Sequence, residues 1–321
     1  MFPVSRPRRL RNNDKIRDLV SETILDPRKL IMPIFIDETA KSPVPVPSMP
    51  GISRQTLESL PDYIGDLDEA GVRSVLLFGI PREKDDRGSS AYQEDGVVQE
   101  SIRVARKTTR QVVIADLCMC EYTSHGHCGI LHGEEVDNDS TLESYGKIAL
   151  SYAKAGVNIV APSGMMDGQV GFIRQSLDRS GYHNVPIMAY SAKYASTMYG
   201  PFRNAADSTP SFGDRRSYQM DPRNSREAMM EIEQDLNEGA DIIMVKPALP
   251  YLDIISRARE SFDAPIAAYS VSGEYTMIRM AVDNGYLAPG AIEESITSIF
   301  RAGADMVITY FAEYLCKNNI E

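Results

Sequence analysis

The sequence contains no tryptophan and only four cysteines among its 321 residues. It also lacks any apolar run near the length of about 18 residues that spans a bilayer, and its first residues lack the apolar segment of a secretory signal. Basic residues are in the minority, with 34 lysines and arginines against 45 aspartates and glutamates, for a net charge of −11. We therefore expect a cytoplasmic protein that binds neither membranes nor nucleic acid.

The remaining composition is that of a globular protein with a large core, 43% hydrophobic and 25% charged. Its length suits two ordinary domains or a single α/β barrel. The opening stretch "RPRRLRNNDKIRDL" is basic enough to suggest an organellar transit peptide, but it carries Asp14 and Asp18. We favour an N-terminal arm over residues 1–28 that contacts a neighbouring subunit.

Eight short apolar runs, rich in β-branched residues, recur along the chain at fairly even intervals. They cover residues 30–36, 72–79, 112–118, 157–163, 186–191, 241–247, 265–272 and 305–311. The runs are continuously hydrophobic rather than alternating, which is typical of strands buried on both faces of a parallel sheet.

Four of these strand candidates follow nearly the same sequence, in "DEAGVRSVLL", "AKAGVNIVAP", "NEGADIIMVK" and "RAGADMVITY". In each, a glycine suited to ending a helix comes just before the apolar run. The repeat predicts alternating helices and strands, and no Gly-rich dinucleotide fingerprint is present. We therefore predict a (β/α)₈ TIM barrel over residues 29–321 rather than a doubly wound sheet.

Two polar insertions interrupt the predicted alternation of helices and strands. Residues 199–224 are rich in Gly, Pro, Ser and Asp, and "GIPREKDDRGSSAYQEDG" follows the second strand candidate. Long loops without secondary structure of their own are often lids, and both insertions follow strands, on the side where barrel enzymes place their chemistry. We predict that residues 199–224 form an active-site lid.

Three of the four cysteines lie close together in "DLCMCEYTSHGHCGIL", as Cys118, Cys120 and Cys128. A disulfide between the first two would close a strained ring, whereas thiolates are soft ligands that suit zinc. Three such ligands would leave a tetrahedral ion one open position. The alternative is a closed structural site in which His125 or His127 supplies the fourth ligand.

Two lysines follow apolar strand sequence: Lys246 ends the run in "IIMVKP", and Lys193 lies just past another in "MAYSAKYAS". Each alone could be a solvated lysine or a salt-bridge partner. At the mouth of one barrel, however, burial and mutual repulsion would favour a neutral amine, which is a nucleophile for carbonyls. The pair therefore suggests Schiff-base catalysis.

Side chains that could hold carboxylates are also available. The lid contributes Arg203, Arg215, Arg216 and Gln219, and strand ends contribute the hydroxyls of Ser163, Ser272 and Tyr310. Solvated arginines and loop-capping hydroxyls are the ordinary explanation of such residues.

The sequence closely resembles the porphobilinogen synthase, or 5-aminolevulinate dehydratase, family. The resemblance runs nearly from end to end, through "RPRRLR", "TSHGHCG", "SAKYAS", "YGPFR", "FGDRRSYQMDP", "MVKPALPYLDI", "VSGEY" and "RAGADMVITYF". It implies a (β/α)₈ barrel with an N-terminal arm, usually assembled as a homo-octamer. The implied reaction condenses two 5-aminolevulinates into porphobilinogen, with loss of water, in tetrapyrrole biosynthesis.

By that resemblance, Lys246 forms the Schiff base with the substrate that becomes the propionate-side half, and Lys193 forms one with the other substrate. Ser272 and Tyr310 resemble the ligands of the first carboxylate. Arg203, Arg215 and Gln219 resemble those of the second, delivered as the lid closes. Arg216 is not carried over.

Family members divide by metal, and Cys118, Cys120 and Cys128 resemble the zinc class rather than the magnesium class. Asp116, at the same strand end, either orients the substrate amine or a water, or makes a structural hydrogen bond. Some members also bind an activating magnesium through a helix carboxylate that matches Glu231, although a solvated helix face would explain this acid too. One departure is that many members have aspartate where this chain has Gly164.

Two other functions would use part of this set of residues. A class I Schiff-base aldolase needs one lysine and a phosphate site, so it leaves Lys193 and the cysteines unexplained. A non-catalytic, zinc-stabilised barrel would use the cysteines but neither lysine.

Overall fold

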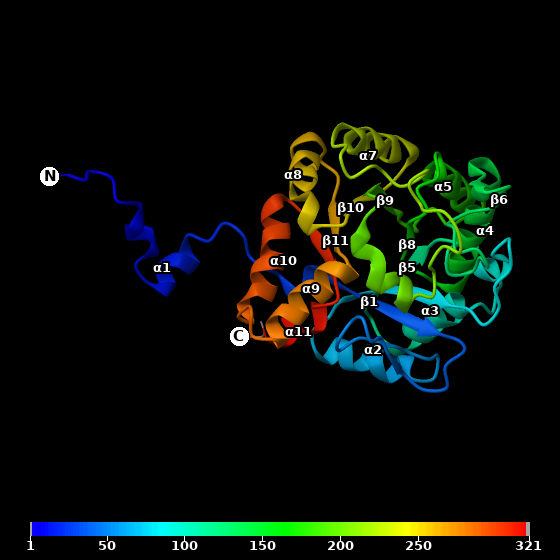
Figure 1. Ribbon diagram of the computed structural model, residues 1–321, viewed down its shortest axis with the longest axis horizontal. Coiled ribbons are helices and arrows are strands. Elements are labelled where there is room, and N and C mark those ends of the chain that lie inside the picture. The colour runs from blue at the N-terminus through cyan, green and yellow to red at the C-terminus, as the bar shows by residue number, and fades with distance from the viewer. Residues whose placement is uncertain (1, 319–321) are drawn as a thin grey trace.

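The eight apolar runs form the eight strands of one sheet in the computed structural model, which describes residues 2–318 (Figure 1). The strands are β1 (Leu30–Asp37), β4 (Ser74–Ile80), β5 (Val112–Leu117), β8 (Ile159–Pro162), β9 (Met188–Lys193), β10 (Ile242–Lys246), β11 (Ile266–Ser270) and β12 (Met306–Thr309). They follow the order β8-β5-β4-β1-β12-β11-β10-β9 with every neighbouring pair parallel. A parallel bridge between Val160 and Ile187 joins β8 to β9 and closes the barrel. The predicted (β/α)₈ barrel is confirmed.

Helices cover the outside of the barrel (Figure 1). They include α2 (Leu60–Glu69), α3 (Val97–Thr108), α4 (Asn138–Ala155), α5 (Gln169–Arg179), α7 (Arg226–Glu238), α8 (Leu252–Ser261), α9 (Ser272–Asp283), α10 (Gly290–Ala302) and α11 (Ala312–Asn318). The four predicted helix exits are present, because Gly71, Gly156, Gly239 and Gly303 all have positive φ angles of 94° to 120°. That geometry lets the chain turn at once from each helix into the next strand.

Burial on both faces explains the continuous apolar runs. All eight residues of β1 are buried, as are five of the six residues of β5. Each fully buried Val, Leu or Ile side chain contributes about 1.5–3 kcal/mol relative to an exposed one. The strands that carry the functional side chains are therefore held by a large apolar core.

Three local features differ from the sequence prediction. Two short hairpins were not predicted: β2 (Val44–Pro45) with β3 (Ser53–Arg54), and β6 (Leu131–His132) with β7 (Glu135–Val136). Each of their strands has two residues, too short for a hydrophobic period. The expectation that residues 199–224 have no secondary structure was wrong, because the helix α6 (Gly200–Ala205) begins there. Proline in its first turn is compatible with a helix start.

The N-terminal segment extends away from the barrel (Figure 1). It contains the 3₁₀ turn η1 (Pro7–Arg11) and the short helix α1 (Asp14–Leu19), neither of which has a buried residue. A further 3₁₀ turn, η2 (Pro27–Lys29), leads into β1. Residue 1 of the predicted arm and residues 319–321 of the predicted barrel lie outside the described residues. No helix among residues 2–318 is long and apolar enough to cross a membrane.

Candidate active site

Lys193 and Lys246 lie side by side at the carboxyl ends of two neighbouring strands. They are the last residues of β9 and β10, and their Cα atoms are partners in the register of that strand pair. Both side chains are 5% exposed. Both nitrogens lie over the ring of Tyr190, at 5.5 Å for Lys193 and 4.9 Å for Lys246, so the two amines lie close to the same aromatic side chain.

Four aromatic rings surround the amine of Lys246. Its Nζ lies 4.3 Å from the ring centroid of Tyr269, 4.9 Å from that of Tyr190, 5.2 Å from that of Phe202 and 5.3 Å from that of Tyr199. Burial, together with the nearby charge of Lys193, lowers the pKa of Lys246 to about 7. A large fraction of this amine is therefore uncharged near neutral pH.

Lys193 has a different environment, since it is tied to the end of β8. Its Nζ donates a hydrogen bond to the carbonyl oxygen of Ser163, and the hydroxyl of Ser163 donates to Asp116 Oδ2 at 3.0 Å. Burial raises the pKa of Asp116, while the charges of Lys246 and Lys193 oppose that rise. Asp116 therefore interacts electrostatically with both amines.

The three cysteines predicted to bind metal converge beside the lysines. Their sulfur atoms all lie within 4.8 Å of one another, and Cys118 Sγ is 3.4 Å from Cys120 Sγ. Within the described part of the chain, they form the one cluster of three or more Cys, His, Asp or Glu that converges in this way. All of them, including Cys128, are buried and free of disulfides.

Electrostatics favours a cation among these sulfurs. Hydrogen bonds from the thiols of Cys118 and Cys120, with the nearby charge of Arg215, lower the pKa of Cys128. Burial raises the pKa of Cys118, and the contact with Cys118 raises that of Cys120. Three thiolates cannot share such a site without positive charge, and soft sulfur ligands in a convergent set suit a metal ion. The residues present therefore fit a metal centre.

The two histidines that could have closed this site are engaged elsewhere. His125 donates through Nε2 to the carbonyl oxygen of Asp86 at 3.2 Å, and its Nδ1 accepts from the backbone N–H of His127 at 3.1 Å. His127 donates through Nε2 to the carbonyl oxygen of Phe212 and accepts at Nδ1 from Tyr218, both at 3.1 Å. This arrangement favours the open site over the closed one.

The predicted lid lies against the cysteine loop. Arg215 Nη2 donates to the carbonyl oxygens of Gly126 at 2.8 Å and Ser208 at 2.6 Å. The approach requires glycine at position 126, because a Cβ there would lie 2.5 Å from the carbonyl oxygen of Thr209. The lid backbone and the cysteine loop therefore pack directly on one another.

Three lid residues present polar atoms that have no partner among residues 2–318. These atoms are Nε of Arg203, Nε of Arg215, and both Nε2 and Oε1 of Gln219. Leaving such groups buried without hydrogen bonds costs about 1–3 kcal/mol each, more for charged groups. An anionic ligand would satisfy the arginine and amide donors together.

The other expected carboxylate ligands lie at the base of the lid. Ser272 begins α9, and its hydroxyl accepts from the backbone N–H of Phe202 at 2.9 Å and lies 3.3 Å from the carbonyl oxygen of Met198. Tyr310 follows β12, and its hydroxyl lies 3.2 Å from that of Tyr269. Both hydroxyls are buried beside the four aromatic rings around Lys246, Tyr190, Tyr199, Phe202 and Tyr269, which we call the aromatic cage. Arg216, by contrast, is exposed and pairs with Asp214 on the surface.

Sequence reasoning missed the residues that hold the lid down. Lys84, from the second polar insertion, donates to both the carbonyl oxygen and Oδ2 of Asp207, each at 2.6 Å. Arg54 donates to the carbonyl oxygen of Asn204 at 2.6 Å and pairs with Asp37. A lysine inside a loop predicted to lie on the same side of the barrel as the lid was the available signal. The sequence contains no signal for the aromatic cage, because its tyrosines resemble ordinary core residues.

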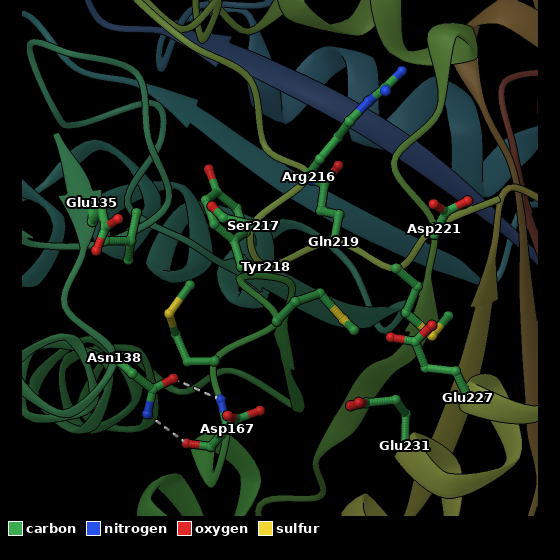
Figure 2. Close-up of a pocket in the computed structure, with 14 residues that line it drawn as sticks. Glu135, Asn138, Asp167, Arg216, Ser217, Tyr218, Gln219, Asp221, Glu227 and Glu231 are labelled. Carbon is green, nitrogen blue, oxygen red and sulfur yellow. Dashed lines mark hydrogen bonds between the residues drawn. The ribbon is translucent and has the colours of Figure 1, made fainter. Parts of the chain in front are cut away.

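Glu231 lies apart from the lysines, in a cavity of about 550 Å³ (Figure 2). The cavity is bounded by the end of the lid, the start of α4 and α7, and Gln219 is among its lining residues. Figure 2 shows Glu231 near Glu227 and Asp167. Burial, and then the charges of Asp167 and Glu227, raise the pKa of Glu231.

Comparison with known proteins places the chain among relatives of similar length. The family model described as delta-aminolevulinic acid dehydratase matches residues 4–318. Curated proteins of that name from Methanothermus sociabilis and Archaeoglobus fulgidus are each 53% identical, over 97% and 98% of both chains respectively. The solved structure of delta-aminolevulinic acid dehydratase (porphobilinogen synthase) from Toxoplasma gondii ME49, in complex with the reaction product porphobilinogen, has a TM-score of 0.96 at 42% identity. That alignment covers 99% of this chain and 92% of the other.

Proposed function

The chain belongs to the delta-aminolevulinic acid dehydratase family, and we propose from this premise that it condenses two 5-aminolevulinates to porphobilinogen, with loss of water, through Schiff bases on Lys246 and Lys193. The observation that carries the proposal is the register pairing of the two lysines over one ring, beside a convergent cysteine trio. An aldolase would leave one amine and the thiols without a role.

Lys246 is the better nucleophile of the pair. Its neutral amine adds to the ketone carbon of one 5-aminolevulinate, and loss of water from the adduct leaves an imine. The aromatic cage excludes bulk water from this step and keeps the amine largely unprotonated at neutral pH. Lys193 forms the Schiff base with the second substrate, and the carbonyl oxygen of Ser163 holds its amine in position.

Asp116 is placed to move or hold a proton. It contacts Ser163 through Oδ2, and it lies close enough to both lysines for their charges to affect its pKa. We assign it the role of orienting the free amine of the second substrate and accepting a proton during ring closure.

Cys118, Cys120 and Cys128 would hold a zinc ion, since three thiolates suit zinc rather than magnesium. When bound, zinc would act there as a Lewis acid with one position open to substrate. The measurement is metal content: about one zinc per chain in the wild type, and none after the three cysteines are replaced by serine. Full activity with magnesium in the zinc-free protein would contradict the assignment.

The substrate carboxylates divide between the lid and the barrel. Arg203, Arg215 and Gln219 offer donors to one carboxylate from the lid, and Ser272 and Tyr310 offer hydroxyls to the other from the barrel. Because the two ligand sets differ in charge, two identical substrates would be held in different orientations, which the asymmetric product requires.

Trapping tests the mechanism directly. Incubation with 5-aminolevulinate and borohydride, followed by peptide mass analysis, should attach the reduced substrate to Lys246, and to Lys193 in a smaller fraction. Lys154, which is exposed and pairs weakly with Glu94, is the matched control and should stay unmodified. Absence of adduct at both active-site lysines would remove the core of the mechanism.

Magnesium at Glu231 is a separate proposal, supported by the crowding of carboxylates in its cavity (Figure 2). A cation there would relieve the repulsion among Glu231, Glu227 and Asp167 and stabilise the end of the lid that shares the cavity. Magnesium should raise the activity of the zinc-loaded wild type and leave Glu231→Gln unchanged. Equal stimulation of both proteins would rule this site out.

Assembly as a homo-octamer is also proposed, with the arm as the contact. Leu19 and Ile24 are 83% and 79% exposed, an arrangement that a neighbouring subunit would cover. Replacing both with aspartate should lower the mass measured by light scattering. A cytoplasmic location agrees with the need to keep the three metal-binding thiols reduced.

A further inference from the structure

Gly164, which lies two residues after the end of β8, faces a buried tyrosine. A Cβ atom built on Gly164 would lie 1.6 Å from the hydroxyl oxygen of Tyr145 and 2.5 Å from its Cζ. Real Cβ contacts are never this short, so the Tyr145 side chain occupies the space that any other residue at position 164 would need. No side chain larger than a hydrogen atom therefore fits at position 164 while Tyr145 is in place.

Tyr145 connects this position to the cysteine loop. It lies in the middle of α4 and is fully buried, and its hydroxyl donates a hydrogen bond to the carbonyl oxygen of Cys128 at 2.7 Å. Cys128 is one of the three convergent thiols. The hydroxyl therefore holds the backbone of a metal-binding residue, at the end of a ring that cannot move in a packed core.

The residue before Gly164 contacts Lys193, one of the two lysines. The preceding residue, Ser163, accepts a hydrogen bond from Lys193 through its carbonyl oxygen and donates one to Asp116 through its hydroxyl. Tyr145 thus packs on the backbone at the end of β8 and at the same time bonds to the cysteine loop. One side chain sets the distance between two parts of the site.

We propose that Tyr145 is a positioning residue that holds the Cys128 backbone in the geometry for metal binding against the β8 end that carries Ser163. Gly164 is its required counterpart, because only glycine leaves room for the hydroxyl. The inference deepens the proposed function and depends on it only for the identity of the metal. Positioning groups behind metal ligands typically change metal affinity by about 10- to 100-fold when removed.

Tyr145→Phe isolates the hydroxyl, because the ring and its packing remain. Zinc affinity, measured with zinc alone by competition against a chromogenic chelator, should fall roughly tenfold, while the melting temperature of the zinc-free protein changes little. Tyr152→Phe is the matched control: it lies on the same helix, is equally buried, and its hydroxyl has no partner among residues 2–318. It should bind zinc like the wild type.

Gly164→Ala tests the steric half of the proposal. The new methyl group must displace the Tyr145 ring, so zinc affinity should fall by at least as much as in Tyr145→Phe. Tyr145→Leu combined with Gly164→Ala removes the clash, and it should restore folding and bind zinc no worse than Tyr145→Leu alone.

Two results would overturn the proposal: unchanged zinc affinity in Tyr145→Phe, or wild-type zinc affinity in a folded Gly164→Ala. If Gly164→Ala does not fold, Tyr145→Phe decides alone. Failure of the proposed function is a separate outcome, since it would appear as absence of a borohydride adduct in the wild type while the zinc measurements stand.

Discussion

The barrel mouth and the lid supply the two sides of the site in contrasting ways. Lys193 and Lys246 are the last residues of hydrogen-bonded strands, and their rotation is limited by rings packed in the core. On the lid, Arg203 lies in the short helix α6, whereas Arg215 and Gln219 lie on irregular chain. The lid is held by contacts to carbonyl oxygens and by the partly buried Lys84.

The barrel mouth and the lid meet different physical requirements. The lysines need a low-dielectric site so that burial can lower an amine pKa, and only the core provides one. In the proposed function the lid donors approach and leave a substrate, and several of their buried polar atoms have no hydrogen-bond partner among residues 2–318. We therefore expect mutations in the barrel mouth to affect kcat and mutations in the lid to affect mainly KM.

The strongest test of the barrel side is Lys246→Ala. Removing the nucleophile should lower kcat by at least about 1,000-fold, because no other amine occupies the centre of the aromatic cage. Porphobilinogen formation is measured at saturating 5-aminolevulinate, together with the circular dichroism of the folded protein. Lys154→Ala is the control for loss of a lysine elsewhere. Substantial kcat in a folded Lys246→Ala would show that the barrel mouth does not supply the nucleophile through this lysine.

On the lid side, Arg215→Gln should raise KM by about 10- to 100-fold, with a smaller change in kcat. The substitution removes a charged donor to the substrate carboxylate, worth about 1.5–3 kcal/mol, as well as two contacts that hold the lid to Gly126 and Ser208. Steady-state kinetics separates the two constants. The exposed Arg216→Gln, one residue along, should leave both unchanged. A fall in kcat alone for Arg215→Gln would place it with the barrel residues.

The pH dependence of catalysis tests whether the amine of Lys246 is neutral when it reacts. The pKa of Lys246 is lowered to about 7, so the amine is mostly neutral above that pH and mostly protonated below it. The value of kcat/KM should therefore fall about tenfold per unit as pH drops below about 6, and level off towards pH 8. Zinc content is measured at each pH as the control, because thiols also bind protons. A flat profile between pH 5.5 and 8, with zinc retained, would contradict a neutral-amine mechanism.

The smallest effect is expected from the contact that holds the lid. Lys84→Met breaks the pairing with Asp207, whose side chain is 66% exposed, and such pairs are worth about 0.2–1 kcal/mol. KM should rise about two- to fivefold at low salt, and the difference should shrink as salt screens the pair. Lys84→Arg should rescue binding. Equal KM values for Lys84→Met and the wild type at low salt would show that this ion pair does not position the lid.

Much of this structure could be predicted because it depends on local pattern. All eight strands were expected within a few residues of their bounds, since burial on both faces leaves a continuous apolar run. The cysteine trio could be found from its spacing, and the lysine pair from its position at strand ends. The lid helix α6 was not expected, because a short helix among Gly, Pro and Ser has no usable period.

Contacts between distant segments could not be predicted. The aromatic cage brings together side chains from β9, the lid and β11, and the pairing of Lys84 with Asp207 joins two insertions 123 residues apart. The Tyr145 and Gly164 pair is of the same kind. In the sequence Gly164 has no evident partner, whereas in the fold the hydroxyl of Tyr145 fills the space beside it.

The sequence by itself determined the barrel, the strand ends that carry the lysines, and the grouping of the three cysteines, because each follows from hydrophobic period or from spacing within one segment. Only the tertiary structure decided the protonation of Lys246, the engagement of both histidines away from the cysteines, and the partner of Gly164. Desolvation, steric exclusion and hydrogen bonding depend on which segments meet, and closure of the barrel brings those segments together.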